Sequence, residues 1–182
     1  MVAVAAACIL LVPATGCAAD PKPAPRSNPP AAAPVFASDE EALAAATEAY
    51  EGYVKTADQI VRDGGSDPSR ISEYVSDDLA ASEVASFASL KDRSLRGVGE
   101  TSYANFSLQQ VSTDPSDKEI VTAYVCSDLS ETDVVDDTGE SVVDPDRPDR
   151  TAFVITFDLS SVDPSALVVS SITVWDGGGV CP

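Results

Sequence analysis

Apolar residues recur at three- and four-residue steps from about residue 43 to residue 61. Ser38 followed by Glu41 forms a capping box just before this stripe, which marks the start of a helix. Gly64 and Gly65 follow it, and glycine commonly ends a helix. The pattern therefore predicts one long amphipathic helix, whose buried stripe comprises Leu43, Ala46, Tyr50, Tyr53, Val54, Ala57, Ile60 and Val61.

Two shorter helices are predicted next. Asp67-Pro68 combines a capping residue with a proline at the first helical position, and the helix that follows buries Ile71, Tyr74 and Val75. Ser76 or Asp77 begins a third helix, in which Ala80, Val84, Phe87, Ala88 and Leu90 face inward. This pattern ends over residues 93–97.

After Gly99 the hydrophobic period changes to two, in runs at about 101–112, 119–130, 150–158 and 167–176. These runs are rich in Val, Ile, Thr, Tyr and Phe, which indicates four strands. Asp-Pro turns within the first and last connections favour antiparallel neighbours. Between the second and third strands, residues 131–149 predict a protruding small hairpin with Asp137-Thr138-Gly139 at its tip.

Helices grouped before strands indicate an α+β fold over residues 38–182, with three N-terminal helices packed on one face of a curved four-stranded antiparallel sheet. This element order resembles the NTF2-like, or cystatin-like, cone fold, although no strand pair is evident between the helices. The resemblance implies a hollow between helices and sheet where proteins of this class hold small molecules.

The N-terminus has the pattern of an export signal. Residues 2–12 are apolar but too short to span a bilayer as a helix, which is typical of a signal peptide. The following Ala14-Thr15-Gly16-Cys17 resembles the lipobox of bacterial lipoproteins, with Ala14 in place of the usual Leu or Val and no basic residue before the apolar run. The alternative is a plain secretory signal in which Cys17 is incidental.

The lipobox resemblance implies a signal peptide at 1–16 and a Cys17 that carries diacylglycerol and fatty acyl chains such as palmitate. It therefore places the protein on the extracytoplasmic face of the cell membrane as a lipid-anchored protein. Residues 17–37 contain the lipidated Cys and a Pro/Ala-rich tether, because proline fixes φ and removes hydrogen-bond donors. One domain, residues 38–182, remains.

The four cysteines are sorted by this processing. Cys8 is removed with the signal and Cys17 takes the lipid, which leaves Cys126 and Cys181 to form a disulfide in an oxidising compartment. In the chain-entropy model this pair would stabilise the fold by about 4 kcal/mol. A redox-active pair is the alternative, although such pairs usually lie close in sequence.

Charge and composition narrow the range of possible functions. The formal net charge is −19, a field that repels nucleic acid and anionic head groups. The sequence contains no His, which removes the usual general base and the commonest metal ligand. Several carboxylates of the predicted hairpin could instead form a calcium site or a solvated acidic turn: Asp133, Asp136, Asp137 and Glu140.

Candidate pocket residues are those expected to line the hollow of the cone or to lie on its strands: Tyr50, Tyr53, Tyr74, Asp128 and Trp175. Aromatic residues at helical spacing are more often part of a core, with their hydroxyl groups hydrogen-bonded. In addition, the segment from Tyr124 to Asp128, together with Trp175 and Cys181, resembles small lipoproteins of high-GC Gram-positive bacteria, most of which have no assigned activity.

The expected function is a non-catalytic binding module without cofactor or metal, with an unknown protein, a cell-wall component or a small molecule as ligand. The alternative is an NTF2-like enzyme of the isomerase or dehydratase type that uses a Tyr and a carboxylate. A homodimer formed through the sheet face is a third interpretation.

Overall fold

A computed structural model describes residues 34–114, 116 and 118–181 of the chain. The predicted signal peptide, Cys8, Cys17 and most of the tether lie outside these residues. Helix α1 spans Asp39–Arg62, and the Ser38 hydroxyl accepts its capping bond from the Glu41 N–H at 3.3 Å. At the other end the Gly65 N–H donates to the Ile60 carbonyl, so the glycines end the helix as predicted.

The second predicted helix is a 3-10 helix, η1, which spans Pro68–Glu73. Asp67 lies in the left-handed region with φ of 47° and makes no capping bond, so no α-helix is nucleated there. The segment has only six residues, and helices this short are commonly of the 3-10 type. Ile71 and Val75 are nevertheless buried, as predicted.

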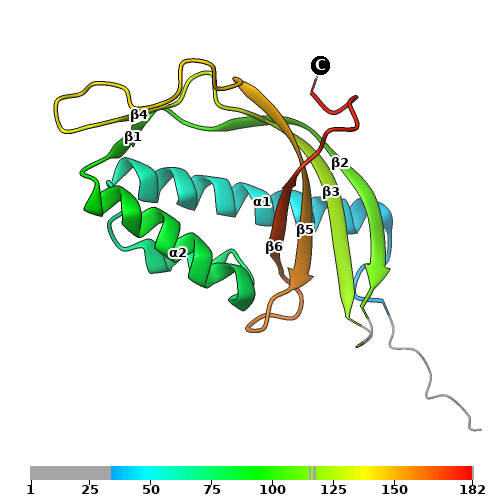
Figure 1. Cartoon of the computed structure of the whole chain (residues 1–182). Coiled ribbons are helices and arrows are strands. Elements are labelled where there is room, and N and C mark those ends of the chain that lie inside the picture. Colours follow the sequence, from blue (N-terminus) through cyan, green and yellow to red (C-terminus); the bar gives the residue numbers. More distant parts are fainter. Residues whose placement is uncertain (1–33, 115, 117, 182) are drawn as a thin grey trace, which may run out of the picture. The chain divides into compact units, whose positions relative to one another are not determined.

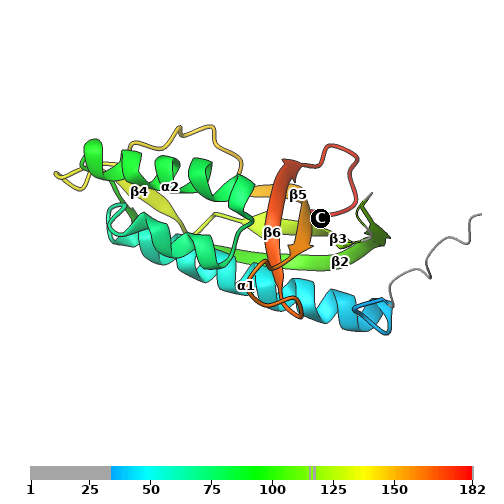
Figure 2. The ribbon, with the colours of Figure 1, turned by 90° about the horizontal axis from the view of Figure 1, so that it is seen from below.

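Helix α2 spans Asp77–Asp92 and is capped by Ser76, which accepts from the Leu79 N–H at 3.4 Å. No residue of α2 is fully buried. Its apolar residues Leu79, Ala80, Val84 and Phe87 are half-buried against the core. The helix is therefore an outer layer of the fold, beside α1 (Figure 2).

The main sheet contains four antiparallel strands in the order β2-β3-β5-β6. Their bounds follow the four predicted runs closely: β2 Ser102–Thr113, β3 Glu119–Asp128, β5 Arg150–Leu159 and β6 Leu167–Val174. The sheet curves around α1 (Figure 1), against which it packs Val121, Val125, Ile155, Phe157 and Val169, all completely buried.

A second sheet was not predicted. Strands β1, Arg96–Val98, and β4, Asp133–Val135, pair antiparallel and continue the β2–β3 ribbon past a kink. The Arg147 guanidinium donates to the carbonyls of Leu129 and Thr132 at this kink, both at 3.0 Å. Strands of three residues show no readable alternation, so the sequence pattern could not reveal them.

The predicted arrangement of three α-helices on one four-stranded sheet, the NTF2-like cone, is therefore wrong. The described residues form two α-helices, one 3-10 helix and two antiparallel sheets of two and four strands. The predicted small hairpin is partly formed, since Val135 forms a bridge with Ser141, but its first strand pairs mainly with β1.

The fold begins before the capping box of α1. Phe36 is 8% exposed and belongs to the core cluster. The Val35 N–H donates to the Glu119 carboxylate, and the Ala37 N–H donates to Glu41 at 2.8 Å. The last residues of the proline-rich segment are thus part of the folded unit.

At the other end of the chain, residues 175–181 form a strap across the face of the main sheet that points away from α1. Cys181 is joined to Cys126 of β3, which confirms the predicted disulfide. The Asn105 side-chain amide donates to the Val180 carbonyl at 2.8 Å, and the Trp175 backbone N–H donates to the Ala152 carbonyl at 2.8 Å. Ala104 and Ala152 flank Cys126 in register, so a row of small side chains lets the strap lie close.

Candidate functional site

A groove of the described domain lies at the end of the main sheet where the β2–β3 and β5–β6 connections turn. It has a volume of about 990 Å³ and is walled by α1, the η1–α2 junction and these two connections. We call it the acidic groove, because the carboxylates that line it are Glu48, Glu73, Asp77, Asp78, Asp114, Glu119, Asp158 and Asp163, and Lys118 is the one described basic residue among its lining.

The floor of the acidic groove is apolar and its rim is charged. Ala45, Ala49, Leu159 and Leu167 line it and pack against the hydrophobic core. Glu48, Glu73, Asp77 and Asp78 are exposed. Val162, on the β5–β6 connection, is 92% exposed beside them. The groove therefore presents an apolar surface between carboxylates.

Three of the groove carboxylates hold the surrounding loops in place. Asp114 accepts from the Ser116 and Lys118 N–H groups at 2.7 and 2.9 Å. Asp163 accepts from the Ser165 N–H and hydroxyl at 2.9 and 2.6 Å, and these bonds lower the pKa of Asp163. Glu119 accepts from Val35. These side chains are structural.

The other five carboxylates of the acidic groove make no side-chain hydrogen bond or ion pair with any described residue: Glu48, Glu73, Asp77, Asp78 and Asp158. Asp77 and Asp78 lie in the first turn of α2, where the helix dipole favours negative charge. The remaining three lie on α1, η1 and β5. Their negative charge is directed at solvent or at a ligand.

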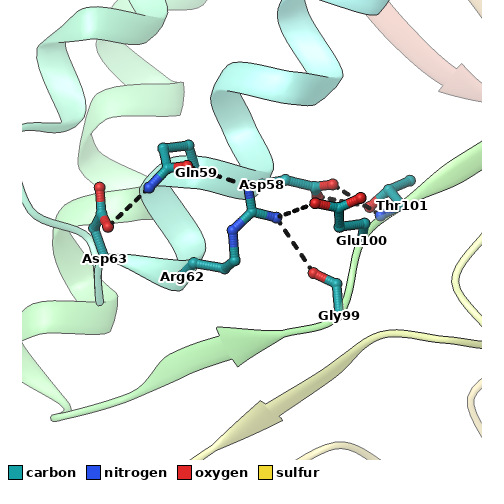
Figure 3. A network of polar contacts seen from close by, with 7 residues as sticks. All are labelled: Asp58, Gln59, Arg62, Asp63, Gly99, Glu100 and Thr101. Carbon is teal, nitrogen blue, oxygen red and sulfur yellow. Dashed lines mark hydrogen bonds and ion pairs between the residues drawn. The ribbon is translucent and has the colours of Figure 1, made fainter.

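A second groove, of about 730 Å³, runs along the solvent face of α1 between η1 and the start of β2. Figure 3 shows the polar contacts along its wall. Asp58 accepts from both the N–H and the hydroxyl of Thr101, each at 2.8 Å. Arg62 donates to the Gly99 carbonyl at 3.3 Å and lies 3.6 Å from the Glu100 carboxylate. This network fastens α1 to the chain between β1 and β2.

Tyr74 and Glu48 line both grooves, so the two adjoin there. The Tyr74 ring lies directly on Gly52 of α1, where a Cβ atom would come within 2.6 Å of the ring. A glycine inside a helix is unfavourable by about 0.5–1 kcal/mol, and this close approach explains its presence. Of the sequence-predicted residues, Tyr74 is the one that reaches a groove.

Tyr50 and Tyr53 lie in the core instead. Tyr50 is 4% exposed and packs edge-on against Tyr103 at 5.1 Å between ring centroids, and burial raises its pKa to about 12. The Tyr53 hydroxyl donates to Glu83 of α2 at 3.2 Å, and burial and this carboxylate raise the pKa of Tyr53. The structure brings these two rings together, 6.2 Å apart, but neither lines a groove.

Asp128 and Trp175 lie away from both grooves. Asp128 accepts from the Ser130 N–H at 3.0 Å and from Arg150 at 2.7 Å; hydrogen bonds to Ser130, and then Arg150, lower its pKa to about 2. Trp175 packs on Tyr124 at 5.0 Å between ring centroids, on the strap side of the sheet. These residues do not share a site with the three tyrosines of the helical region.

The acidic hairpin uses two of its carboxylates in internal hydrogen bonds. Asp133 accepts from the Val134 N–H and the Ser141 hydroxyl, both at 2.7 Å. Asp136 accepts from the Thr138 hydroxyl at 2.7 Å, which lowers its pKa. Within residues 34–114, 116 and 118–181, no three His, Cys, Asp or Glu side chains gather closely enough to hold a metal ion.

The acidic groove was not predicted from the sequence. Its carboxylates come from helices and loops far apart in the chain, so no local motif contains them. One signal was present: Asp114 and Asp163 each begin an Asp-Pro turn. Since antiparallel neighbours place alternate turns at the same end of a sheet, the two turns could have been expected to lie close together.

No protein-family profile matches the chain, and no curated protein matches it. Among solved structures, the intermembrane space region of the chloroplast protein ARC6 is similar with a TM-score of 0.50 and 11% identity, over 72% of this chain and 95% of that one. A periplasmic fragment of TraM is similar with a TM-score of 0.46 and 17% identity, over 76% of this chain and 98% of the fragment. At 11% identity, the similarity to ARC6 concerns the fold alone.

Among the described residues, no helix has both the length and the apolar character needed to cross a membrane.

Proposed function

We propose that this protein is a lipid-anchored extracytoplasmic lipoprotein whose folded domain is a non-catalytic binding module. The observation that carries the proposal is the Cys126–Cys181 disulfide. Disulfides of this structural kind form and persist in oxidising compartments, outside the bacterial cytoplasm. Export agrees with the apolar run at residues 2–12, and the lipobox-like Ala14-Thr15-Gly16-Cys17 that follows it supplies the anchor.

Binding is favoured over catalysis by the ionisation of the described side chains. The carboxylates whose pKa is shifted most clearly, among them Asp128 and Asp163, have pKa values below the usual one. The buried Tyr50 and Tyr53 have pKa values above the usual one. Each therefore keeps one protonation state near neutral pH, whereas a general acid or base works best with a pKa near the operating pH. The Tyr53–Glu83 pair, the nearest approach to an isomerase-like dyad, lies outside both grooves.

The acidic groove is the proposed binding surface. It combines an apolar floor with rim carboxylates that have no partner among the described residues. It also lies at the end of the sheet where Glu119 holds Val35. The groove and the last residues of the tether are therefore at the same end of the domain.

Cys17→Ala tests the anchor. We expect the wild-type protein to fractionate with membranes and to incorporate a labelled palmitate analogue, and the variant to lose both properties because the acyl chains are absent. Cys8→Ala is the matched control, since this cysteine precedes the proposed processing site. Membrane attachment of the Cys17→Ala variant, or a wild-type protein without label, would reject lipidation.

A further inference from the structure

We infer that the acidic groove docks a cationic segment of a partner protein in which basic and apolar side chains alternate. The inference deepens the proposed function, because it names the partner of the same surface. Two separate properties of the groove carry it: the apolar floor and the charged rim.

The apolar floor requires side chains from the partner. Ala45, Ala49 and Leu159 line the groove and are half-buried, so each leaves apolar surface open to it. Val162 is the most exposed large apolar side chain of the described domain, at 92%, and it stands beside this floor. A small inorganic or polyamine cation would leave this apolar surface in water, whereas Val or Leu side chains would cover it.

The rim selects for positive charge along an extended stretch. Its unpaired carboxylates lie on α1, η1, the first turn of α2 and β5, around the opening rather than at one point. A single ion could not satisfy such spread charges, but basic residues at intervals along a peptide could. Lys118 is the one described basic residue that lines the groove, so the electrostatic potential of the groove is negative.

The probe is a short synthetic peptide of alternating Lys and Val, titrated into the purified full-length protein in detergent. Its Lys–Ser counterpart carries the same charge without the apolar side chains. We expect the Lys–Val peptide to bind about tenfold more tightly, because only it covers the floor. Equal affinities, or no binding, would overturn the inference, since charge alone would then explain the interaction.

Matched charge variants separate the groove from the field of the whole molecule. The groove variant is Glu48→Gln, Glu73→Gln and Asp158→Asn. The control variant is Glu131→Gln, Asp137→Asn and Glu140→Gln, in and beside the β4 hairpin. This hairpin extends from the other end of the main sheet (Figure 1). Both variants remove the same charge from side chains without described hydrogen bonds. We expect the groove variant to weaken Lys–Val binding about tenfold and the control variant by less than about twofold.

Equal losses in the two charge variants would overturn the assignment to the groove. Val162→Ser is a second test that leaves the fold intact, because this side chain is 92% exposed. It should weaken binding of the Lys–Val peptide by about threefold and leave Lys–Ser binding unchanged. An unchanged Lys–Val affinity would contradict the apolar contact. None of these results depends on the lipid, so failure here is distinguishable from failure of the Cys17→Ala experiment.

Discussion

The two faces of the main sheet are closed by different physical means. Toward α1, Val121, Val125, Ile155, Phe157 and Val169 are fully buried in one continuous core. The opposite face carries Thr122, Thr156 and Ser171 in register across three strands, and the strap of residues 175–181 covers its other end. One face is held by the burial of apolar area and the other by a covalent bond with a few hydrogen bonds.

This difference explains how a chain with a modest core can support a long sheet. The apolar contacts of the strap lie outside the core cluster: Trp175 packs on Tyr124, and Val180 is buried. The disulfide instead limits the conformations of the unfolded chain by closing a loop with a sequence separation of 55 residues. The core face should therefore decide whether the domain folds, and the strap face how stable it is once folded.

The largest effect is expected on the core face. Phe157→Ala should lower the free energy of unfolding by about 5 kcal/mol, because it removes a fully buried ring that packs against Phe106 and leaves a cavity. Urea unfolding followed by circular dichroism measures this loss. Val162→Ala, at a 92% exposed position, is the control and should change stability little. A loss below about 2 kcal/mol would show that the core can collapse around the missing ring.

The two faces also differ in how far the sequence predicted them. The strands and α1 were readable because Ile155, Phe157 and the α1 stripe repeat at the periods of a strand and a helix. The disulfide followed from cysteine counting and export. The strap, by contrast, has no hydrophobic period. Its course depends on Ala104 and Ala152, and their small side chains make room for the strap only because the strand register places them on either side of Cys126.

The elements that were missed depend on contacts between distant segments. Strand β1 packs Gly97 against Val61, where a Cβ atom would come within 2.4 Å of the Val61 side chain. No sequence pattern near Gly97 predicts this contact. Asp67 adopts a left-handed conformation and leaves η1 uncapped, although Asp-Pro is a common start for an α-helix. The acidic groove likewise exists only in the folded chain.

The second largest effect concerns the strap. Replacing Cys126 and Cys181 together with Ala should lower stability by about 4 kcal/mol. At neutral pH without denaturant the circular dichroism spectrum should remain, because the core cluster excludes the strap. Trp175 is the only Trp of the chain, so its fluorescence reports release of the strap from Tyr124. Loss of helical signal together with the fluorescence change would mean that the two faces fold as one unit.

A smaller effect is expected at Asn105, which has a φ of 54° and donates to the Val180 carbonyl at 2.8 Å. Asn105→Ala loses the hydrogen bond and places an unfavourable residue in the left-handed region, for a total of about 2 kcal/mol. Asn105→Gly loses only the hydrogen bond, for about 1 kcal/mol. Thermal unfolding of both variants separates the two contributions. Equal losses would show that backbone strain does not matter at this position.

The smallest effect is a pH dependence on the strap face, where Asp128 shares the side of β3 that carries Cys126 and pairs with Arg150. Hydrogen bonds to Ser130, and then Arg150, lower the pKa of Asp128 from 3.8 to about 2 in the folded state. A lowered pKa stabilises the fold above the unfolded value, and this contribution is lost as the pH falls from about 4 to about 2. Asp128→Asn should therefore make the free energy of unfolding less dependent on pH in this window, as measured by urea unfolding at a series of pH values.

Asp137→Asn, on the exposed hairpin, is the control and should leave the wild-type pH dependence unchanged. If the Asp128→Asn profile kept the wild-type slope, acid sensitivity would belong to other carboxylates, and the Asp128–Arg150 pair would not contribute to closure of the strap face.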